Sequence, residues 1–206
     1  MNKQKVCILD YKSGNVGSVY NMTKYMNYNV VISNDEKDIK QSTHLILPGV
    51  GSFSRAMKNI NSLLPIKIIE KEIFENKKPF LGICVGMQVL ATKGFEHGEY
   101  TGLGWIDGEV NILNSKKLPL PNIGWNGIII NEKSKLTDNL DGLKDFYFVH
   151  SFKFDPKDKS HINAYTEYGE KFCSIVNNNN IFGVQFHPEK SQKSGMKMLS
   201  NFFSCS

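Results

Sequence analysis

A cysteine between two glycines is the residue of this sequence best suited to chemistry. Cys84 follows the apolar run 80–83, and Gly82 and Gly86 stand two residues before and after it. Glycines at these positions let a strand turn sharply into a helix and hold the side chain at the apex in the open. Free backbone N–H groups at a helix start favour a thiolate there. The pattern predicts a nucleophile, although free cysteines are often buried core residues instead.

A cysteine nucleophile needs a base, and the base needs a group that orients it. His187 ends the apolar run 182–186 and precedes Pro188 and Glu189. A strand-end histidine with a carboxylate two residues later can be held in one tautomer and orientation. Without the cysteine motif, a surface glutamate beside a strand-end histidine would be the simpler interpretation. The segments around three further histidines predict surface or unremarkable positions, namely His44, His97 and His161.

Strand and helix patterns alternate through the first half of the chain. Strands are predicted at 6–10, 29–33 and 45–47 and in the apolar run before Cys84, and helices at about 16–26 and 54–76, with a break near Pro65. This alternation predicts an α/β fold with a parallel sheet, whose sites lie beyond the carboxyl ends of the strands. Asp10, Gly49 and Cys84 all fall at such ends.

The second half of the chain predicts short strands with little helix between them. These strands are expected at 105–113, 127–131, 146–149, 163–168, 172–177 and 181–185. We interpret them as antiparallel additions around the parallel core, so that residues 1–206 form a single domain. The run Asn177–Asn180 predicts a hairpin turn, because asparagine tolerates positive φ. A final helix is predicted at 192–203, with Met196, Leu199, Phe202 and Phe203 on its buried face.

The composition is that of an ordinary globular enzyme or binding protein. The chain has 206 residues, 40% hydrophobic and 22% charged, with a net charge of +5. The lysines are scattered and Arg55 is the only arginine, which argues against a nucleic-acid surface. No stretch predicts a membrane span, and the start of the chain has no signal-peptide pattern, so we expect a cytoplasmic protein. The four cysteines lack metal-ligand spacing, and we expect neither a metal nor a cofactor.

The motifs together resemble the class I, triad-type glutamine amidotransferases. The resemblance rests on residues 82–88 and 183–189, and it extends over nearly the whole chain through the blocks 10–15, 47–53, 121–126, 148–151 and 187–191. It implies the flavodoxin-like fold of that family, with a mostly parallel central sheet flanked by helices. More narrowly, the chain is similar to the glutaminase subunits of imidazole glycerol phosphate synthases. Those subunits hydrolyse L-glutamine and pass the ammonia to a separate (β/α)8 cyclase subunit in histidine biosynthesis.

Carried over position by position, the resemblance implies a catalytic triad and an oxyanion site. Cys84 is expected to be the nucleophile, His187 the acid and base, and Glu189 the residue that orients His187. The oxyanion donors would be the N–H of Val85 and a peptide N–H of the glycine-rich segment that contains Val50 and Gly51. A plain turn after a core strand remains the alternative for that segment.

The resemblance also implies a substrate site and a docking face. Substrate contacts are expected from Gly49, Gln88, Glu96, His150 and Ser151, with His150 offering backbone groups and not a base. Glu96 could equally be a solvated loop charge, and Trp125 could equally be a core residue. The face that docks on the cyclase is expected near Tyr11, Asn15, Trp125, Asn126 and Lys190.

Two departures from the family pattern leave the partner open. Lys12 and Asn122 both flank the expected docking face. The chain could therefore be a paralogous ammonia-donating subunit for amidation of a nucleotide sugar or a surface-polysaccharide sugar. It could also be a catalytically inactive regulatory relative, against which an intact Cys84, His187 and Glu189 argue, or a stand-alone cysteine hydrolase.

Overall fold

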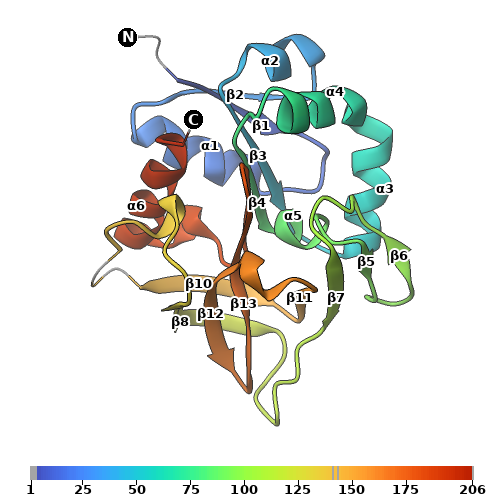
Figure 1. Cartoon of the computed structure of the whole chain (residues 1–206), viewed down its shortest axis with the longest axis vertical. Coiled ribbons are helices and arrows are strands. Elements are labelled where there is room, and N and C mark those ends of the chain that lie inside the picture. The colour runs from blue at the N-terminus through green and yellow to red at the C-terminus, as the bar shows by residue number, and fades with distance from the viewer. Residues whose placement is uncertain (1–3, 141, 143, 206) are drawn as a thin grey trace.

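The structure, a computed structural model, describes residues 4–140, 142 and 144–205 and is built around one eight-stranded sheet (Figure 1). The strand order is β2-β1-β3-β4-β14-β13-β12-β9. The parallel part consists of β2 (Asn29–Ser33), β1 (Lys5–Leu9), β3 (His44–Gly49), β4 (Phe80–Cys84) and β14 (Ile181–Val184). The antiparallel part consists of β13 (Glu170–Asn178), β12 (Ile162–Tyr168) and β9 (Ile129–Ile130). The predicted α/β fold, mainly parallel with added antiparallel strands, is confirmed. The single domain stays a prediction, and residues 1–3 at the chain start lie outside the described residues.

Strand β14 is the one part of this sheet that the sequence interpretation placed wrongly. We expected it among the antiparallel additions, yet it pairs in parallel with β4, and Val184 lies opposite Ile83. It pairs antiparallel with β13 through the predicted asparagine turn, where Asn179 has a φ of 56°. A central strand has two neighbours, and a hairpin on one side says nothing about the direction of the strand on the other.

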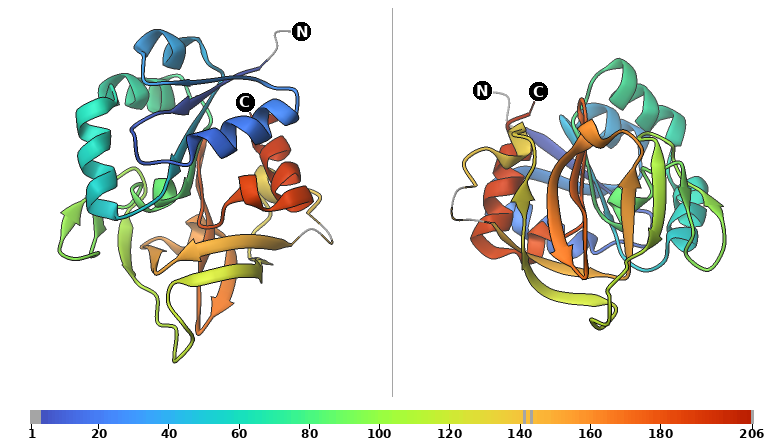
Figure 2. Two further views of the ribbon diagram at one scale, coloured as in Figure 1. Left: turned by 180° about the vertical axis from the view of Figure 1, so that it is seen from behind. Right: turned by 60° about the horizontal axis from the view of Figure 1, so that its bottom comes forward.

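Helices cover both faces of the parallel strands (Figures 1 and 2). On one side lie α1 (Val16–Tyr25) and α6 (Gln192–Phe203), and on the other α3 (Phe53–Leu63), α4 (Ile66–Glu70) and the π-helix Lys71–Glu75. The predicted break near Pro65 is confirmed, since Pro65 separates α3 from α4. In α6, Met198 is buried where Met196 was expected, and Met196 is only partly buried. Among the described residues, none of the helices has the length and apolar composition that crossing a bilayer requires.

Two smaller sheets lie beyond the carboxyl end of the parallel strands (Figure 2). In one, β8 (Asn122–Gly127) pairs antiparallel with β10 (Asp145–His150). The other has the order β11 (Phe152–Pro156), β7 (Gly108–Ile112), β5 (Lys93–Gly94) and β6 (Tyr100–Thr101). The sequence did not predict β8 or β11. Glycine and asparagine interrupt the apolar pattern of β8, and only Ser151 separates β11 from β10.

His44 is a core residue, which corrects the surface position expected for it. It begins β3, a central strand buried along its whole length, and is 2% exposed. Its Nε2 lies 3.1 Å from the carbonyl oxygen of Cys205, and its ring packs edge-on against Phe202. Burial lowers the pKa of His44. A strand covered by helices on both faces buries every residue, whatever its polarity.

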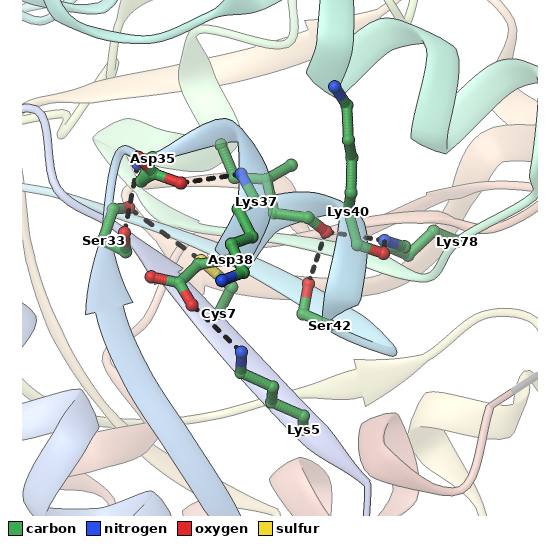
Figure 3. A network of polar contacts seen from close by, with 10 residues as sticks. Lys5, Cys7, Ser33, Asp35, Lys37, Asp38, Lys40, Ser42 and Lys78 are labelled. Atoms are coloured by element: carbon green, nitrogen blue, oxygen red, sulfur yellow. Dashed lines mark hydrogen bonds and ion pairs between the residues drawn. The ribbon is translucent and has the colours of Figure 1, made fainter.

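Polar side chains at the amino-terminal ends of the parallel strands form a group around α2 (Glu36–Gln41), and Figure 3 shows four of them, Lys5, Asp38, Ser42 and Lys78. Lys78 donates to the carbonyls of Ile39 and Lys40 at 2.7 and 3.1 Å, and its Nζ lies 2.8 Å from Glu72. These bonds satisfy helix-end carbonyls that have no partner inside α2. We call this group the amino-edge cluster; its members are Lys5, Asp38, Ser42, Glu72 and Lys78.

Candidate active site

Cys84 occupies a strained turn between β4 and α5 (Val85–Gln88). Its φ of 55° and ψ of −112° are unusual for a residue with a side chain, and such strain gathers at functional sites. A Cβ on Gly82 would meet the carbonyl of Gly86, and one on Gly86 would meet the carbonyl of Leu47. The glycine spacing therefore has the steric role predicted for it. Helix α5, which follows the turn, ends at Gln88.

The parallel pairing of β4 with β14 brings the histidine to the cysteine. Because Val184 lies opposite Ile83, the chain after β14 leaves the sheet beside Cys84. His187 Nδ1 lies 2.8 Å from Glu189 Oε1, and their side chains are 4% and 1% exposed. Burial alone would lower the pKa of His187, but hydrogen bonds to Cys84 and Glu189 outweigh it and raise that pKa to about 10. The three residues of the predicted triad thus lie together.

The thiol of Cys84 has two further polar neighbours that the sequence interpretation missed. Its Sγ lies 3.7 Å from the carbonyl oxygen of Val149 and 3.7 Å from Nε2 of Gln185. Gln185 is fully buried, and its Oε1 accepts a hydrogen bond from Gln88 Nε2 at 3.1 Å. A signal for it was present, because Gln185 and His187 are two residues apart and so point to the same side of an extended chain.

A pocket of about 710 Å³ opens above the thiol. Its lining comes from the ends of β3, β4, β10 and β14 and from the loops around β7 and β8. The predicted residues that line it are Val50, Gly51, Cys84, Val85, Gln88, Glu96, His150, Ser151, His187 and Lys190. Glu189 lies behind His187, and Gly49 packs beneath the pocket, where a Cβ would come within 2.5 Å of the Gly86 nitrogen. One cavity therefore collects residues from distant parts of the sequence.

The segment after β3 lines the pocket, but its Val50 N–H is bonded to another loop. The N–H of Val50 donates to the carbonyl of Ser13 at 2.9 Å, and the Ser13 hydroxyl donates back to the Val50 carbonyl at 3.3 Å. Gly51 has a φ of 88°, in the left-handed region that favours glycine. The Val50 side chain is exposed. The N–H of Val50 is thus engaged elsewhere and does not face the thiol.

The expected substrate residues differ in how firmly they are held. Gln88 uses both amide hydrogens within the protein, donating to Phe152 O at 2.9 Å and to Gln185. Glu96 is not a freely solvated charge, since its Oε2 accepts from the Phe53 N–H at 2.7 Å. Burial lowers the pKa of His150 to about 4, which agrees with its not being predicted as a base.

The residues expected at the docking face differ in how exposed their side chains are. Tyr11 is fully buried, so it has no surface of its own at that face, and its place near the face stays a prediction. Trp125 is 48% exposed and is therefore not a core residue. Its ring centroid lies 6.0 Å from that of Tyr147, and Lys190 Nζ lies 5.8 Å from the Tyr147 ring. Tyr147 joins the two predicted residues, although nothing in the sequence singled it out. Asn15 is half-buried at the start of α1.

Comparison with known proteins identifies the family. Residues 7–205 match the family model described as glutamine amidotransferase class-I. The chain belongs to the class-I glutamine amidotransferase family. Among curated members of this family, it is 46% identical over 198 residues to "Imidazole glycerol phosphate synthase subunit HisH 2" of Methanococcus maripaludis, covering 96% of this chain and 98% of the relative. It is 45% identical over 202 residues to "Imidazole glycerol phosphate synthase subunit HisH" of Aquifex aeolicus, covering 96% and 95%.

Solved structures show that the class-I amidotransferase fold extends to more distant proteins. The chain is similar to PurLQS from Thermotoga maritima, with a TM-score of 0.73 at 19% identity over 97% of each chain. It is also similar to a glutamine amidotransferase from Thermotoga maritima, with a TM-score of 0.62 at 17% identity over 97% of this chain and 84% of the second protein. Identities this low show a shared fold.

Proposed function

We propose that this class-I glutamine amidotransferase is the glutaminase subunit of an imidazole glycerol phosphate synthase. It hydrolyses L-glutamine to glutamate and ammonia, and it passes the ammonia to a (β/α)8 cyclase subunit in histidine biosynthesis. The observation that carries the proposal is that His187, paired with the buried Glu189 at 2.8 Å, lines the same pocket as Cys84. The names of the curated relatives support the pathway.

The reaction follows from the positions of three side chains. The Cys84 thiolate attacks the side-chain amide carbon of glutamine, which forms a C–S bond and a tetrahedral oxyanion. His187 gives a proton to the amide nitrogen, the C–N bond breaks, and ammonia leaves. His187 then takes a proton from water, which attacks the thioester carbon and breaks the C–S bond to release glutamate. Glu189 holds the Nδ1 proton of His187, so that Nε2 serves both steps.

The oxyanion needs hydrogen-bond donors that are in place before the attack. The N–H of Val85, next to the nucleophile, is one donor. The second comes from the Val50–Gly51 segment once the Val50 peptide turns. The bond from the Val50 N–H to Ser13 supports a resting state with only one donor in place. Partner docking biases this segment toward the competent orientation, because ammonia released without an acceptor is lost to solvent.

Exposed apolar side chains around the pocket mouth support a partner that covers it. Ile112, Val50 and Leu120 are exposed apolar side chains of the pocket lining, and Ile123 and Trp125, two residues apart on β8, are 60% and 48% exposed. An apolar rim around a polar site fits a heterodimer interface that also shields ammonia from water.

The test is glutamate release by the chain alone, with a (β/α)8 cyclase subunit, and with that subunit plus its acceptor substrate. The free chain should bind glutamine but hydrolyse it about 10²–10³-fold more slowly than the loaded complex, the usual effect of one missing oxyanion donor. Full activity of the free chain would instead favour a stand-alone hydrolase. No glutamate release under any condition would favour an inactive relative.

A further inference from the structure

A continuous series of neutral polar groups begins at the exposed edge of β8. Asn126 Nδ2 donates to Asn122 Oδ1 at 3.0 Å, and Asn122 Nδ2 lies 3.2 Å from His150 Nε2. His150 Nδ1 in turn lies 2.8 Å from the carbonyl oxygen of Phe152. These three contacts lead from the surface of the small β8–β10 sheet to the wall of the glutamine pocket.

The same carbonyl connects this series to the thiol. Gln88 Nε2 donates to Phe152 O at 2.9 Å and to Gln185 Oε1 at 3.1 Å. Gln185 Nε2 then lies 3.7 Å from Cys84 Sγ. We call the whole series the amide relay; its members, from the surface inward, are Asn126, Asn122, His150, the Phe152 carbonyl, Gln88 and Gln185.

The direction of each hydrogen bond in the relay is fixed by chemistry. A carbonyl can only accept, so the His150 nitrogen that faces Phe152 O, Nδ1, must carry the proton. A neutral imidazole then has an unprotonated Nε2, which accepts from the Asn122 amide. His150 is 6% exposed and packs against the rings of Phe148 and Phe172, so the ring has little freedom to turn.

Strand pairing explains why the relay can cross from one sheet to the pocket. Asn122 lies directly opposite His150 in the β8–β10 pair. Asn126 is four residues further along β8, and the two asparagine side chains meet across Gly124, which has a φ of 145°. Asn126 is half-buried and adjoins the exposed Trp125. The outer end of the relay is therefore accessible from the surface.

We propose that Asn122 is a positioning residue that ties the Trp125–Asn126 end of β8 to the glutamine pocket, by holding His150 as the neutral Nδ1–H tautomer. The Phe152 carbonyl accepts from both His150 and Gln88, so it joins the imidazole of the first to the amide of the second. With both of its amide hydrogens engaged, Gln88 turns its side-chain oxygen to the pocket, as an acceptor. The effect on catalysis rests on the proposed glutaminase function, whereas the tautomer itself does not.

The decisive experiment changes Asn126, at the outer end of the relay, and observes His150, two members further in. In Asn126→Asp, the introduced carboxylate faces Asn122 Oδ1, so the Asn122 amide must turn to donate to it. Its oxygen then faces His150 Nε2, which must take up a proton. Asn126→Ala removes the hydrogen bond to Asn122 Oδ1 but introduces no acceptor in its place, so Asn122 keeps its orientation. The two variants should therefore differ at His150, a residue that neither substitution touches.

The measurement is two-bond ¹H–¹⁵N correlation NMR of the free, histidine-labelled chain, with the His150 signal assigned from His150→Gln. Wild type and Asn126→Ala should both show a protonated Nδ1 and a bare Nε2 at about pH 7, because neutral imidazole is the form that the relay holds. Asn126→Asp and Asn122→Asp should show a protonated Nε2. A wild-type pattern in Asn126→Asp would overturn the proposal.

Asn201→Asp is the matched control for these variants. Asn201 is another buried asparagine with two hydrogen bonds, to the carbonyls of Leu136 and Asp138, and it lies on α6 outside the relay. The His150 signals of Asn201→Asp should match wild type. A protonated Nε2 in this control as well would show that His150 responds to any loss of packing, and it would overturn the proposal.

Kinetics with the cyclase partner separates this proposal from the proposed function. Asn122→Asp should raise the KM for glutamine about tenfold and change kcat less, since one buried hydrogen bond is disturbed beside the substrate and the triad is untouched. Equal losses in the Asn201→Asp control would reduce the effect to general destabilisation and overturn the proposal. If wild type releases no glutamate, the proposed function fails, and the NMR result still decides whether the relay exists.

Discussion

The two edges of the parallel sheet hold their polar groups in different ways. The amino-edge cluster consists mainly of charged side chains that bind helix carbonyls and each other. Lys78, for example, donates to the carbonyls of Ile39 and Lys40 and pairs with Glu72. The carboxyl edge uses neutral amides, one histidine–glutamate pair, and a thiol that faces an open pocket. At the amino edge the polar groups bind other parts of the protein, whereas at the carboxyl edge several of them face a pocket that can hold a ligand. The contrast predicts that substitutions at the two edges will separate stability from activity.

The greatest loss of activity is expected at the thiol. Cys84→Ala should abolish glutamine-dependent turnover, because the nucleophile that forms the thioester is gone. Added ammonium salts should still supply the partner's reaction, since the cyclase active site is unchanged. Glutamate release and cyclase product formation are measured in parallel. Comparable glutamine consumption by Cys84→Ala would show that another residue is the nucleophile.

A somewhat smaller loss is expected at the histidine–glutamate pair. His187→Asn should lower glutaminase activity by about 10²–10⁴, the usual contribution of a general acid and base. Glu189→Gln should cost less, because a neutral amide can still hydrogen-bond to the ring and orient it. Steady-state rates of the two variants in the complex provide the comparison. Equal, complete loss in both would mean that Glu189 does more than orient His187.

The same pair predicts how stability depends on pH. The pKa of His187 is raised to about 10 from an ordinary value of 6.5. A raised histidine pKa contributes stability that is fully present below pH 6.5 and is lost as the pH rises towards 10. Denaturant unfolding of wild type should therefore show a stability that declines over this range, and Glu189→Gln should show a shallower decline. An identical pH dependence in the two proteins would contradict the pairing.

A substitution in the amino-edge cluster should affect stability and not catalysis. Lys78→Met leaves Glu72 and two helix carbonyls without their partner, and breaking a buried pair in this way costs about 3–5 kcal/mol. The side chains of Lys78 and Glu72 are 8% and 9% exposed, so water cannot replace the lost contacts. Denaturant unfolding measures the loss, and the glutaminase rate per folded molecule should match wild type. A large fall in that rate would show that the two edges are not independent.

The mildest change is expected at Lys190, on the rim of the pocket. Its side chain is exposed, and its Nζ lies 5.8 Å from the centre of the Tyr147 ring. Lys190→Ala should leave unfolding of the free chain unchanged, and it should slow association with the cyclase and reduce its salt dependence, as rim charges commonly do. Association rates at two ionic strengths measure this. Unchanged association would remove Lys190 from the docking face.

Much of the carboxyl edge was predictable because its chemistry is local in sequence. The glycines around Cys84 and the two-residue step from His187 to Glu189 are short-range patterns, and each has a steric or geometric consequence that needs no distant residue. The positions of Tyr11 and His44 were not predictable in this way. Both have polar atoms and stand near strand ends, yet both are buried, because helices and loops from elsewhere in the chain cover them.

Local conformations in this protein can be read from a few consecutive residues: the turn at Cys84, the asparagine hairpin before β14, and the break at Pro65 between α3 and α4. Which of these segments become neighbours depends instead on the assembled core. The parallel pairing of β14 with β4 places Gln185 and His187 beside Cys84, and the pairing of β8 with β10 places Asn122 against His150. The difference arises because φ and ψ preferences act within a few residues, whereas strand order depends on how every element packs against the rest.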